Sequence, residues 1–489
     1  MSAVAPARPA AATAAALEAD LVAVLGRARV FADAPLRAAY GADRTECPPG
    51  DPVLVVQACT TEEVAEVLRV AGRHRTPVVP RVTGNNVGGL TIPHEGAIVL
   101  DLASMDRILD VDEDDMYALI EPGVSWQQLK DHLEARGHGL RLGFPLAPPE
   151  TSVAAGCLMD GLGSLTLAHG PMGQWINGLE VVLPSGEIVR TGAAALSDSW
   201  FSRAPLPDLT GLFLNWFGAT GVVTKLAIQL WPRPALRRRV FVLGHDLGAL
   251  FAVMRRLGRT GQMDDVGAIG WPAGKMLFGV ERPAVDPAPG EPVAYLFADL
   301  SAGGAAELAL KGAVLEEALA EARRAGARLD GPIEMDTLVR LDPRFAKFAD
   351  YPTRLDFLLD HRGGGLSWVG TYGPQARLER AAERAVAILR AHGFPPLLVS
   401  RPMRGGHFAV LRFIVTFDRT DDGEAQNVRA CNRALVEALV DEGFVPYKMP
   451  GWAARQLREK FDPGFVALME RIKKLLDPQG LMNPGTWWW

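Results

Sequence analysis

A glycine-rich loop, "PRVTGNNVGG" (80–89), lies between two short apolar segments and restricts the fold more than any other stretch of the chain. Its three glycines and two asparagines let the backbone turn tightly and approach another group closely. A P-loop would need a Lys-Ser or Lys-Thr pair after the glycines, and a Rossmann motif would open a helix. Here "LTIPHEGAIVLDL" continues as a turn and a strand. Two interpretations remain, a turn without a ligand and a nest of backbone N–H groups that binds a pyrophosphate.

Short strands and helices alternate around this loop. The apolar stretches predict strands at 52–58, 77–81 and 96–105, and "TTEEVAEVLRVAGRHR" (60–75) predicts a helix capped by Thr60. Strands that lie this close together in the chain are typical of an α/β or α+β architecture.

The pattern changes after a basic hinge, "RPALRRR" (233–239). Long alanine-rich helices are predicted at 304–326 and 375–393, with apolar strands between and after them. This order predicts a second domain at about 236–440, an antiparallel sheet that helices cover on one face. An amphipathic helix is expected after residue 460, ended by Asp-Pro and a glycine turn.

Composition and charge exclude several classes of protein. A chain of 489 residues is long enough for two domains, and its net charge of -6 gives no attraction to nucleic acid. Four scattered cysteines without C-x-x-C spacing argue against disulfides and a zinc site, and no metal is expected. The most apolar window, 211–231, contains Asn215, Lys225 and Gln229, so we expect no membrane span. Without an apolar secretion signal in 1–18, a cytoplasmic protein is expected.

Three further segments accompany the glycine loop in order. They are a small-residue stretch with a strand and turn (148–192), "DLTGLFLNWFGATGVVTKLAIQLWP" (208–232) and the closing "LLDPQGLMNPG" (475–485). This order resembles the vanillyl-alcohol oxidase / p-cresol methylhydroxylase (PCMH) flavoprotein family. The resemblance covers about 50–235 and 440–489 well, and the middle of the chain loosely.

The resemblance implies an α+β fold whose two-part FAD-binding domain of the PCMH type is formed from both chain ends. An antiparallel sheet with helices would be inserted as a cap domain over the flavin. The expected parts are a flexible arm (1–18), the FAD-binding domain (19–235), the cap or substrate domain (236–440) and a C-terminal segment that returns to the FAD domain (441–489).

The resemblance also implies where FAD binds. The glycine loop would wrap the pyrophosphate with its backbone N–H groups, residues 148–170 would line the flavin, and 218–223 would hold the adenosine half. The expected cofactor-binding residues are Arg81, Val82, Thr83, Gly84, Asn85, Asn86, Val87, Gly88, Pro148, Thr151, Ser152, Ala155, Gly156, Gly161, His169, Gly218, Gly221, Val222, Val223 and Asn483.

Some relatives bond the flavin covalently. Asn85 stands where a loop histidine would form that bond, and Pro148 stands near the place of a second, cysteinyl tether. Noncovalent FAD is therefore expected. His407, before the apolar strand that ends in Phe417-Asp418-Arg419, is the remaining candidate for a covalent bond, although its spacing is longer than in relatives.

Candidate catalytic residues follow from the phenol-oxidising members, which carry a Tyr-Arg pair before their last helix. Tyr447 and Lys448 stand there, and a hydroxyl beside a cation can stabilise a phenolate. Asp160 lies near the place where relatives keep an Asp close to flavin N5. Arg404 and His407 are the other polar candidates on the cap side.

Three functions remain open from the sequence. The first is an FAD-dependent oxidase or dehydrogenase that takes a hydride from an alcohol, with a para-substituted phenol or benzylic alcohol as the candidate substrate and O2 or an electron carrier as the acceptor. The second is a D-2-hydroxy-acid dehydrogenase (glycolate or lactate type) passing electrons to a quinone, cytochrome or partner subunit, although "RGGHFAV" replaces the metal-binding signature of that group. The third is a non-catalytic flavin-binding subunit. A homodimer is one possible assembly.

The chain closes on three consecutive tryptophans, Trp487 to Trp489. Tryptophan favours membrane interfaces, so a membrane anchor is one hypothesis. We expect instead that the three rings cover an apolar patch of the flavin domain.

Overall fold

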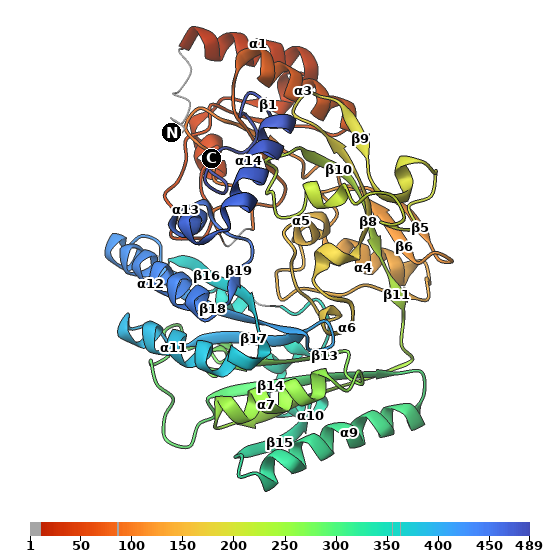
Figure 1. The fold of residues 1–489 in the computed structure, drawn as a ribbon, viewed down its shortest axis with the longest axis vertical. Coiled ribbons are helices and arrows are strands. Elements are labelled where there is room, and N and C mark those ends of the chain that lie inside the picture. Colours follow the sequence, from red (N-terminus) through yellow and green to blue (C-terminus); the bar gives the residue numbers. More distant parts are fainter. Residues whose placement is uncertain (1–10, 86–87, 355, 362) are drawn as a thin grey trace.

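Two small sheets form the upper part of the molecule in Figure 1. The computed structural model describes residues 11–85, 88–354, 356–361 and 363–489. The first sheet has the strand order β1-β2-β4-β3, in which β2, β4 and β3 are parallel and β1 is antiparallel to β2. Its strands are β1 (Val30–Phe31), β2 (Leu54–Gln57), β3 (Val78–Arg81) and β4 (Ile98–Asp101).

The second sheet is antiparallel and joins residues from 108 to 229 in the order β5-β6-β10-β8-β9. Its strands are β5 (Ile108–Asp112), β6 (Tyr117–Ile120), β8 (Ile176–Val182), β9 (Ile188–Arg190) and β10 (Val222–Gln229). Every residue of β8 is buried, because both faces of this central strand are covered. A separate pair joins β7 (Leu140–Arg141) to β11 (Trp231–Pro232).

Helices α1 (Ala11–Leu25) and α3 (Thr61–His74) pack on the first sheet. The Thr60 hydroxyl accepts a hydrogen bond from the Glu63 N–H at 3.2 Å, which confirms the predicted cap of α3. Helix α1 includes residues 11–18 of the segment that we expected to be a flexible arm. Leu17 on α1 is completely buried, so apolar packing orders that stretch.

The shorter helices connect the strands of both halves. They are α2 (Ala34–Tyr40), α4 (Trp126–Ala135), α5 (Val153–Leu158), α6 (Thr166–His169), α8 (Pro272–Leu277) and α10 (Met335–Leu341). A capping box between Ser125 and Gln128 begins α4, and the buried side of that helix packs through Leu129 and Leu133.

An eight-stranded sheet forms the lower part of the molecule, with the order β15-β12-β14-β13-β17-β18-β16-β19. All its pairs are antiparallel, and β12 begins at Leu236, directly after the expected domain boundary. The strands are β12 (Leu236–Gly244), β13 (Asp265–Gly270), β14 (Ala294–Ala302), β15 (Leu329–Glu334), β16 (Gly364–Gly373), β17 (Leu397–Met403), β18 (Phe408–Asp418) and β19 (Val445–Pro446).

The two faces of this cap sheet differ in chemistry. On β18, Leu411, Phe413 and Val415 belong to the core that the cap helices cover, whereas the alternate residues Val410 and Arg412 belong to the opposite face. The covering helices are α7 (Leu247–Gly258), α9 (Ala305–Arg324), α11 (Leu378–Ala391) and α12 (Asp422–Asp441). The predicted antiparallel sheet is therefore confirmed, with its four long helices on one face, whereas the short helix α8 packs on the other face.

The chain returns to the first domain after the cap. Helices α13 (Gly451–Leu457) and α14 (Pro463–Leu476) lie in the upper part of Figure 1, beside the N-terminal elements. Met482 then forms a parallel bridge with Val78 of β3. The upper domain is thus built from both chain ends, as the resemblance implied.

Among the residues that the structure describes, no helix is both long and apolar enough to cross a membrane. The apolar window 211–231 forms a 3-10 turn and strand β10, as its interruption by polar residues predicted.

The three closing tryptophans pack against the upper domain. The Trp487 ring lies 6.0 Å from Phe217 and its indole N–H donates to the Asn215 carbonyl at 3.0 Å. The Trp489 ring stacks on Trp216 at 5.9 Å. The rings therefore cover apolar residues of this domain, as we expected.

We predict that Trp487→Ala lowers the free energy of unfolding by about 2 kcal/mol, because it removes a half-buried ring and its hydrogen bond. The measurement is chemical denaturation of the purified protein. Leu475→Ala is the control, because Leu475 is 80% exposed and its loss should change stability by less than about 0.5 kcal/mol. Equal effects of both substitutions would contradict a packing role for Trp487.

Candidate active site

The glycine loop follows β3 and has a backbone that only glycine adopts without strain. Gly84 has a φ of +69°, and a Cβ there would lie 2.2 Å from Nη2 of Arg81. The Arg81 side chain folds back over the loop, donates to the Tyr40 carbonyl at 2.9 Å and lies over the Tyr40 ring. Of the other predicted loop residues, Asn86 and Val87 lie outside the described residues. The loop thus keeps a cation and exposed backbone close together, which suits a pyrophosphate.

Two distant segments lie against this loop. The Asn483 side-chain amide donates to the Leu90 carbonyl at 3.3 Å and to the Phe217 carbonyl at 2.5 Å. Gly218 has a φ of +78°, and a Cβ there would lie 2.5 Å from Cγ of Pro80. The loop, the start of 218–223 and the closing tail therefore meet, as expected if all three hold one dinucleotide.

The small-residue segment is packed against its own domain. Ser152 caps α5 by accepting from the Ala155 N–H at 3.0 Å. A Cβ at Gly156 would lie 3.1 Å from the Trp126 ring, and one at Gly161 would lie 2.8 Å from the Gly156 carbonyl. Part of the glycine pattern is thus explained by close packing of the chain on itself.

Four aromatic side chains, Trp368, Tyr372, Phe408 and Tyr447, form a cluster on the face of the cap sheet away from the helices. Tyr447 stacks on Tyr372 with ring centroids 4.4 Å apart, and Trp368 meets Tyr447 edge-on at 5.2 Å. Gly370 permits this contact, because a Cβ there would lie 2.7 Å from Tyr447 and 2.8 Å from Trp368. We call these four residues the aromatic cluster.

Two cations lie beside the aromatic cluster. The Arg412 guanidinium lies 5.1 Å from the Trp368 ring centroid and Nζ of Lys448 lies 5.4 Å from it. Burial lowers the pKa of Lys448, and repulsion by the nearby charge of Arg412 acts in the same direction, so that this pKa is about 8. Burial also lowers the pKa of Arg412. Within the described chain neither side chain forms an ion pair. Lys448 also has a φ of +48°, a strained backbone typical of functional positions.

Asp160, from the upper domain, reaches the aromatic cluster. Its backbone carbonyl accepts from the Tyr372 hydroxyl at 2.7 Å, and its carboxylate accepts from the Gly173 N–H at 3.0 Å. Burial raises the pKa of Asp160 to about 6 although Lys448 lies near enough to oppose the shift. Asp160 has a φ of +49°, so three of the predicted catalytic residues are strained, Asp160, Lys448 and Arg404. The structure therefore brings Asp160, Tyr447 and Lys448 together.

Arg404 and His407 are not brought to this cluster. Strand β17 ends at Met403 and β18 begins at Phe408, so both residues fall in the tight turn between the strands and are exposed. The turn touches the upper domain only through its backbone, where the Arg404 N–H donates to the Thr166 carbonyl at 3.1 Å. We predicted Arg404 and His407 only as further polar candidates on the cap side, and the structure places both side chains in this exposed turn.

His169 was expected beside the flavin ring. It is exposed and stacks on Trp231 with ring centroids 4.7 Å apart, where burial of one side lowers the pKa of the imidazole. Its observed role is packing at the end of α6.

Sequence reasoning missed Arg412, Trp368 and Tyr372. The signal was present in the strand "VLRFIVTFDR", where one arginine interrupts an apolar run on the strand face that does not meet the helices. The alternation in "GLSWVGTYG" likewise puts Trp368, Gly370 and Tyr372 on one face.

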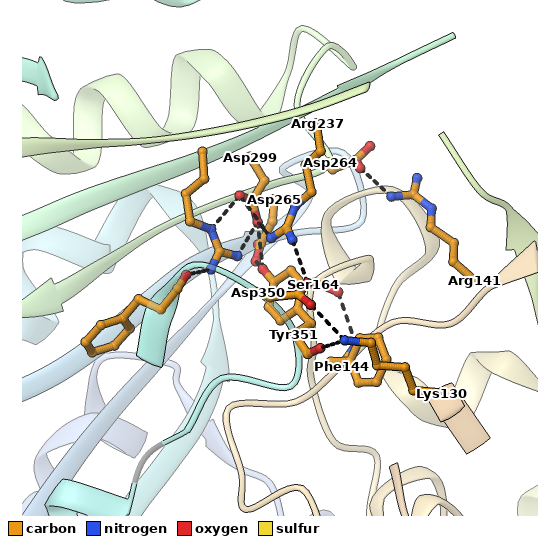
Figure 2. Close-up of polar contacts among 12 residues, drawn as sticks. Lys130, Arg141, Phe144, Ser164, Arg237, Asp264, Asp265, Asp299, Asp350 and Tyr351 are labelled. Carbon is orange, nitrogen blue, oxygen red and sulfur yellow. Dashed lines mark hydrogen bonds and ion pairs between the residues drawn. The ribbon is translucent and has the colours of Figure 1, made fainter. Parts of the chain in front are cut away.

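A network of buried charges continues along the same face of the cap sheet (Figure 2). Arg239 donates to both carboxylate oxygens of Asp299, at 2.6 and 2.5 Å, and Arg401 donates to Asp265 at 2.8 Å. The Tyr351 hydroxyl lies between the acids, at 2.7 Å from Asp299 and 3.2 Å from Asp265. We call these five residues the junction network, because they lie where the cap meets the upper domain.

Neighbouring ion pairs cross this junction. Lys130 on α4 donates to Asp350 at 2.8 Å and to the Tyr351 carbonyl at 2.6 Å, and Arg141 on β7 donates to Asp264 at 2.6 Å. A cavity of about 290 Å3 lies among these residues. These ion pairs thus connect the cap to helix α4 and strand β7 of the upper domain.

Comparison with known proteins agrees with this architecture. Residues 52–192 match the family described as "FAD binding domain", and residues 371–487 match "FAD linked oxidases, C-terminal domain". The flavoprotein subunit of 4-cresol dehydrogenase (hydroxylating) from Pseudomonas putida is 25% identical over 89% of this chain and 87% of its own.

A glycolate oxidase subunit from Bacillus subtilis is 32% identical, but the match spans only 44% of either chain. A solved structure of p-cresol methylhydroxylase with substrate bound superposes with a TM-score of 0.83, at 21% identity, over 98% of this chain and 97% of that one. This structural likeness shows the fold.

We predict that Arg239→Met lowers the free energy of unfolding by about 3–5 kcal/mol, because it leaves the buried carboxylate of Asp299 without its partner. Arg324→Met is the matched control, since Arg324 pairs with Glu317 on the exposed surface and should contribute less than about 1 kcal/mol. Denaturant unfolding of both variants is the measurement. A small effect of Arg239→Met would show that the junction network does not hold the cap in place.

Proposed function

Because the chain belongs to the FAD-linked oxidases with a PCMH-type FAD-binding domain, we propose that it takes a hydride from an alcohol or benzylic carbon of an aromatic substrate. In this proposal Tyr447 and Lys448 bind an anionic oxygen of the substrate, as in a phenolate. The likeness to the cresol dehydrogenase subunit over most of both chains supports this substrate class.

One observation carries the proposal, the aromatic cluster with a cation and a strained aspartate at its edge. Flat apolar side chains suit an aromatic ring, and Tyr447 and Lys448, which both contact the Trp368 ring, offer a hydroxyl and a positive charge beside it. Burial raises the pKa of Tyr447 to about 12, so its hydroxyl stays protonated and can donate a hydrogen bond.

When bound, FAD supplies the hydride acceptor, and the protein positions the substrate and tunes its charge. The glycine loop, 218–223 and Asn483 would hold the dinucleotide through the contacts described above. A hydrogen bond from Tyr447 and the charge of Lys448 stabilise the substrate oxyanion, which raises electron density at the carbon that loses hydride.

Asp160 would hold or move a proton at the same site. Its pKa of about 6 leaves the carboxylate mostly ionised at neutral pH but close enough to neutrality to accept a proton. The strained backbone and the Gly173 hydrogen bond fix where the carboxylate points.

A second candidate is oxidation of a 2-hydroxy acid. The 32% identity to a glycolate oxidase subunit favours it over part of the chain. Within the described chain no group of histidines, cysteines and acids could hold a metal ion, which weakens this candidate because that subgroup carries metal ligands in its signature. O2 or an electron carrier would reoxidise the flavin in either case.

The test is a panel of phenols and alcohols mixed anaerobically with the holoenzyme, read as bleaching of the flavin absorbance. Tyr447→Phe keeps the ring that stacks on Tyr372 and removes one donor, so the rate of flavin reduction should fall about 10²–10³-fold. Flavin content should be unchanged.

Tyr117→Phe is the matched control, since Tyr117 is buried in the upper domain away from the aromatic cluster. O-methylation of the substrate phenol should remove most of the effect of Tyr447→Phe. An unchanged reduction rate in Tyr447→Phe with a good substrate would refute the oxyanion role.

We further predict a pH dependence from Asp160. Its folded-state pKa is raised, so the carboxylate ionises only as the pH rises through about 6, and the rate of flavin reduction should rise over that range. In Asp160→Asn this limb of the pH profile should disappear. At pH 8 the same substitution removes the penalty of burying an ionised carboxylate, so the variant should unfold at a higher temperature than the parent. A retained limb near pH 6 would exclude Asp160 as its source.

A further inference from the structure

One edge of the Arg412 guanidinium is buried without a partner. The side chain is 8% exposed, and its Nε and Nη2 atoms form no hydrogen bond with any described residue. These two nitrogens direct their N–H groups from the same edge, in the parallel fork that binds a carboxylate through two oxygens. A buried donor left unsatisfied costs about 1–3 kcal/mol, so this edge is expected to have a ligand.

The surrounding charges do not neutralise Arg412. Two buried acids of the cap sheet, Asp265 and Asp299, already contact Arg401 and Arg239. Burial raises the pKa of Asp265 to about 7, which leaves still more positive charge uncompensated. Lys448 adds a second cation, and the groups that face them are Asp160, Tyr372, Tyr447 and Arg401.

Arg412 lies beside the aromatic cluster. It pairs with Gly370 across β16 and β18, in the row between Trp368 and Tyr372. A single phenolate oxygen could satisfy one donor of the fork but not both with good geometry. A two-oxygen anion satisfies both.

We infer that the substrate carries a carboxylate in addition to the oxygen that Tyr447 and Lys448 bind, and that Arg412 binds this carboxylate through Nε and Nη2. This inference rests on the proposed function and names its substrate class, an aromatic carboxylic acid. Arg412 thereby distinguishes acids from neutral phenols.

The reduced flavin also offers two adjacent acceptors, its N1 and O2 atoms, and could use the same edge. The two candidate partners of this edge, the substrate and the flavin, can be distinguished by esterification. An ester removes the substrate carboxylate but leaves the flavin unchanged. If Arg412 instead contacts the flavin, replacing Arg412 changes the reduction potential of the flavin even when no substrate is bound.

The experiment titrates the oxidised holoenzyme with 4-hydroxyphenylacetate and with its methyl ester, read as perturbation of the flavin spectrum. The parent protein should bind the acid at least about 30-fold more tightly than the ester, as expected for a desolvated bidentate pair. Arg412→Met should remove this preference while leaving the affinity for the ester within about threefold. Arg412→Lys keeps the charge but loses the two parallel donors, so it should retain only part of the preference for the acid over the ester.

Arg384→Met is the control for loss of a cap arginine, because Arg384 lies on the exposed side of α11. The flavin reduction potential is measured on all variants and should stay unchanged. A shifted potential in Arg412→Met with equal losses for acid and ester would assign the edge to the flavin and overturn the inference.

The comparison of acid with ester in the parent protein needs no variant, so it holds even if Arg412→Met fails to fold. If both probes bind equally well, the carboxylate inference fails and the phenol site stands. If neither probe perturbs the flavin and no phenol or alcohol of the panel reduces it, the proposed function fails as well.

Discussion

The period-two alternation of the cap sheet is the constraint on which the rest of the structure depends. The long strands give one set of apolar residues to the four long helices, and their alternate residues form the aromatic cluster, the junction network and a second apolar cluster on α8. A shift of β18 by one residue would send Arg412 into the helix-covered core and Phe413 to the opposite face. The same register that builds the core thus also places the charges, so stability and site geometry cannot vary independently.

Burial away from water decides how the charged side chains on this sheet face contribute to stability and binding. The junction network is balanced, because Arg239 and Arg401 each meet an acid and Tyr351 lies between the acids. Beside the aromatic cluster the balance fails, and Arg412 and Lys448 face a single aspartate. Two neighbouring regions of one sheet face therefore have opposite uses, since paired charges hold the domains together and unpaired ones are available to a ligand.

The sequence predicted the architecture well, because Thr60, the glycine loop and the Ala-rich helices each carry a local signal. It also brought Tyr447, Lys448 and Asp160 into one site through family resemblance. The exposed position of Arg404 and His407 could not be predicted, because a shift of a few residues decides between strand face and exposed turn, and that boundary depends on pairing with distant strands. Arg412 was missed because its role follows from its burial beside Trp368 and Lys448. Residue spacing along the chain does not predict such contacts between distant strands.

The tail contact has a consequence for biosynthesis. Met482 pairs with Val78 and Asn483 bonds to Leu90, so the edge of the first sheet and the glycine loop are completed by residues about four hundred positions downstream. Such long-range closure is slow and comes late in folding. The inserted domain must therefore be synthesised before the tail can reach the glycine loop, and if this loop holds FAD as we propose, FAD is expected to bind only after the tail has emerged from the ribosome.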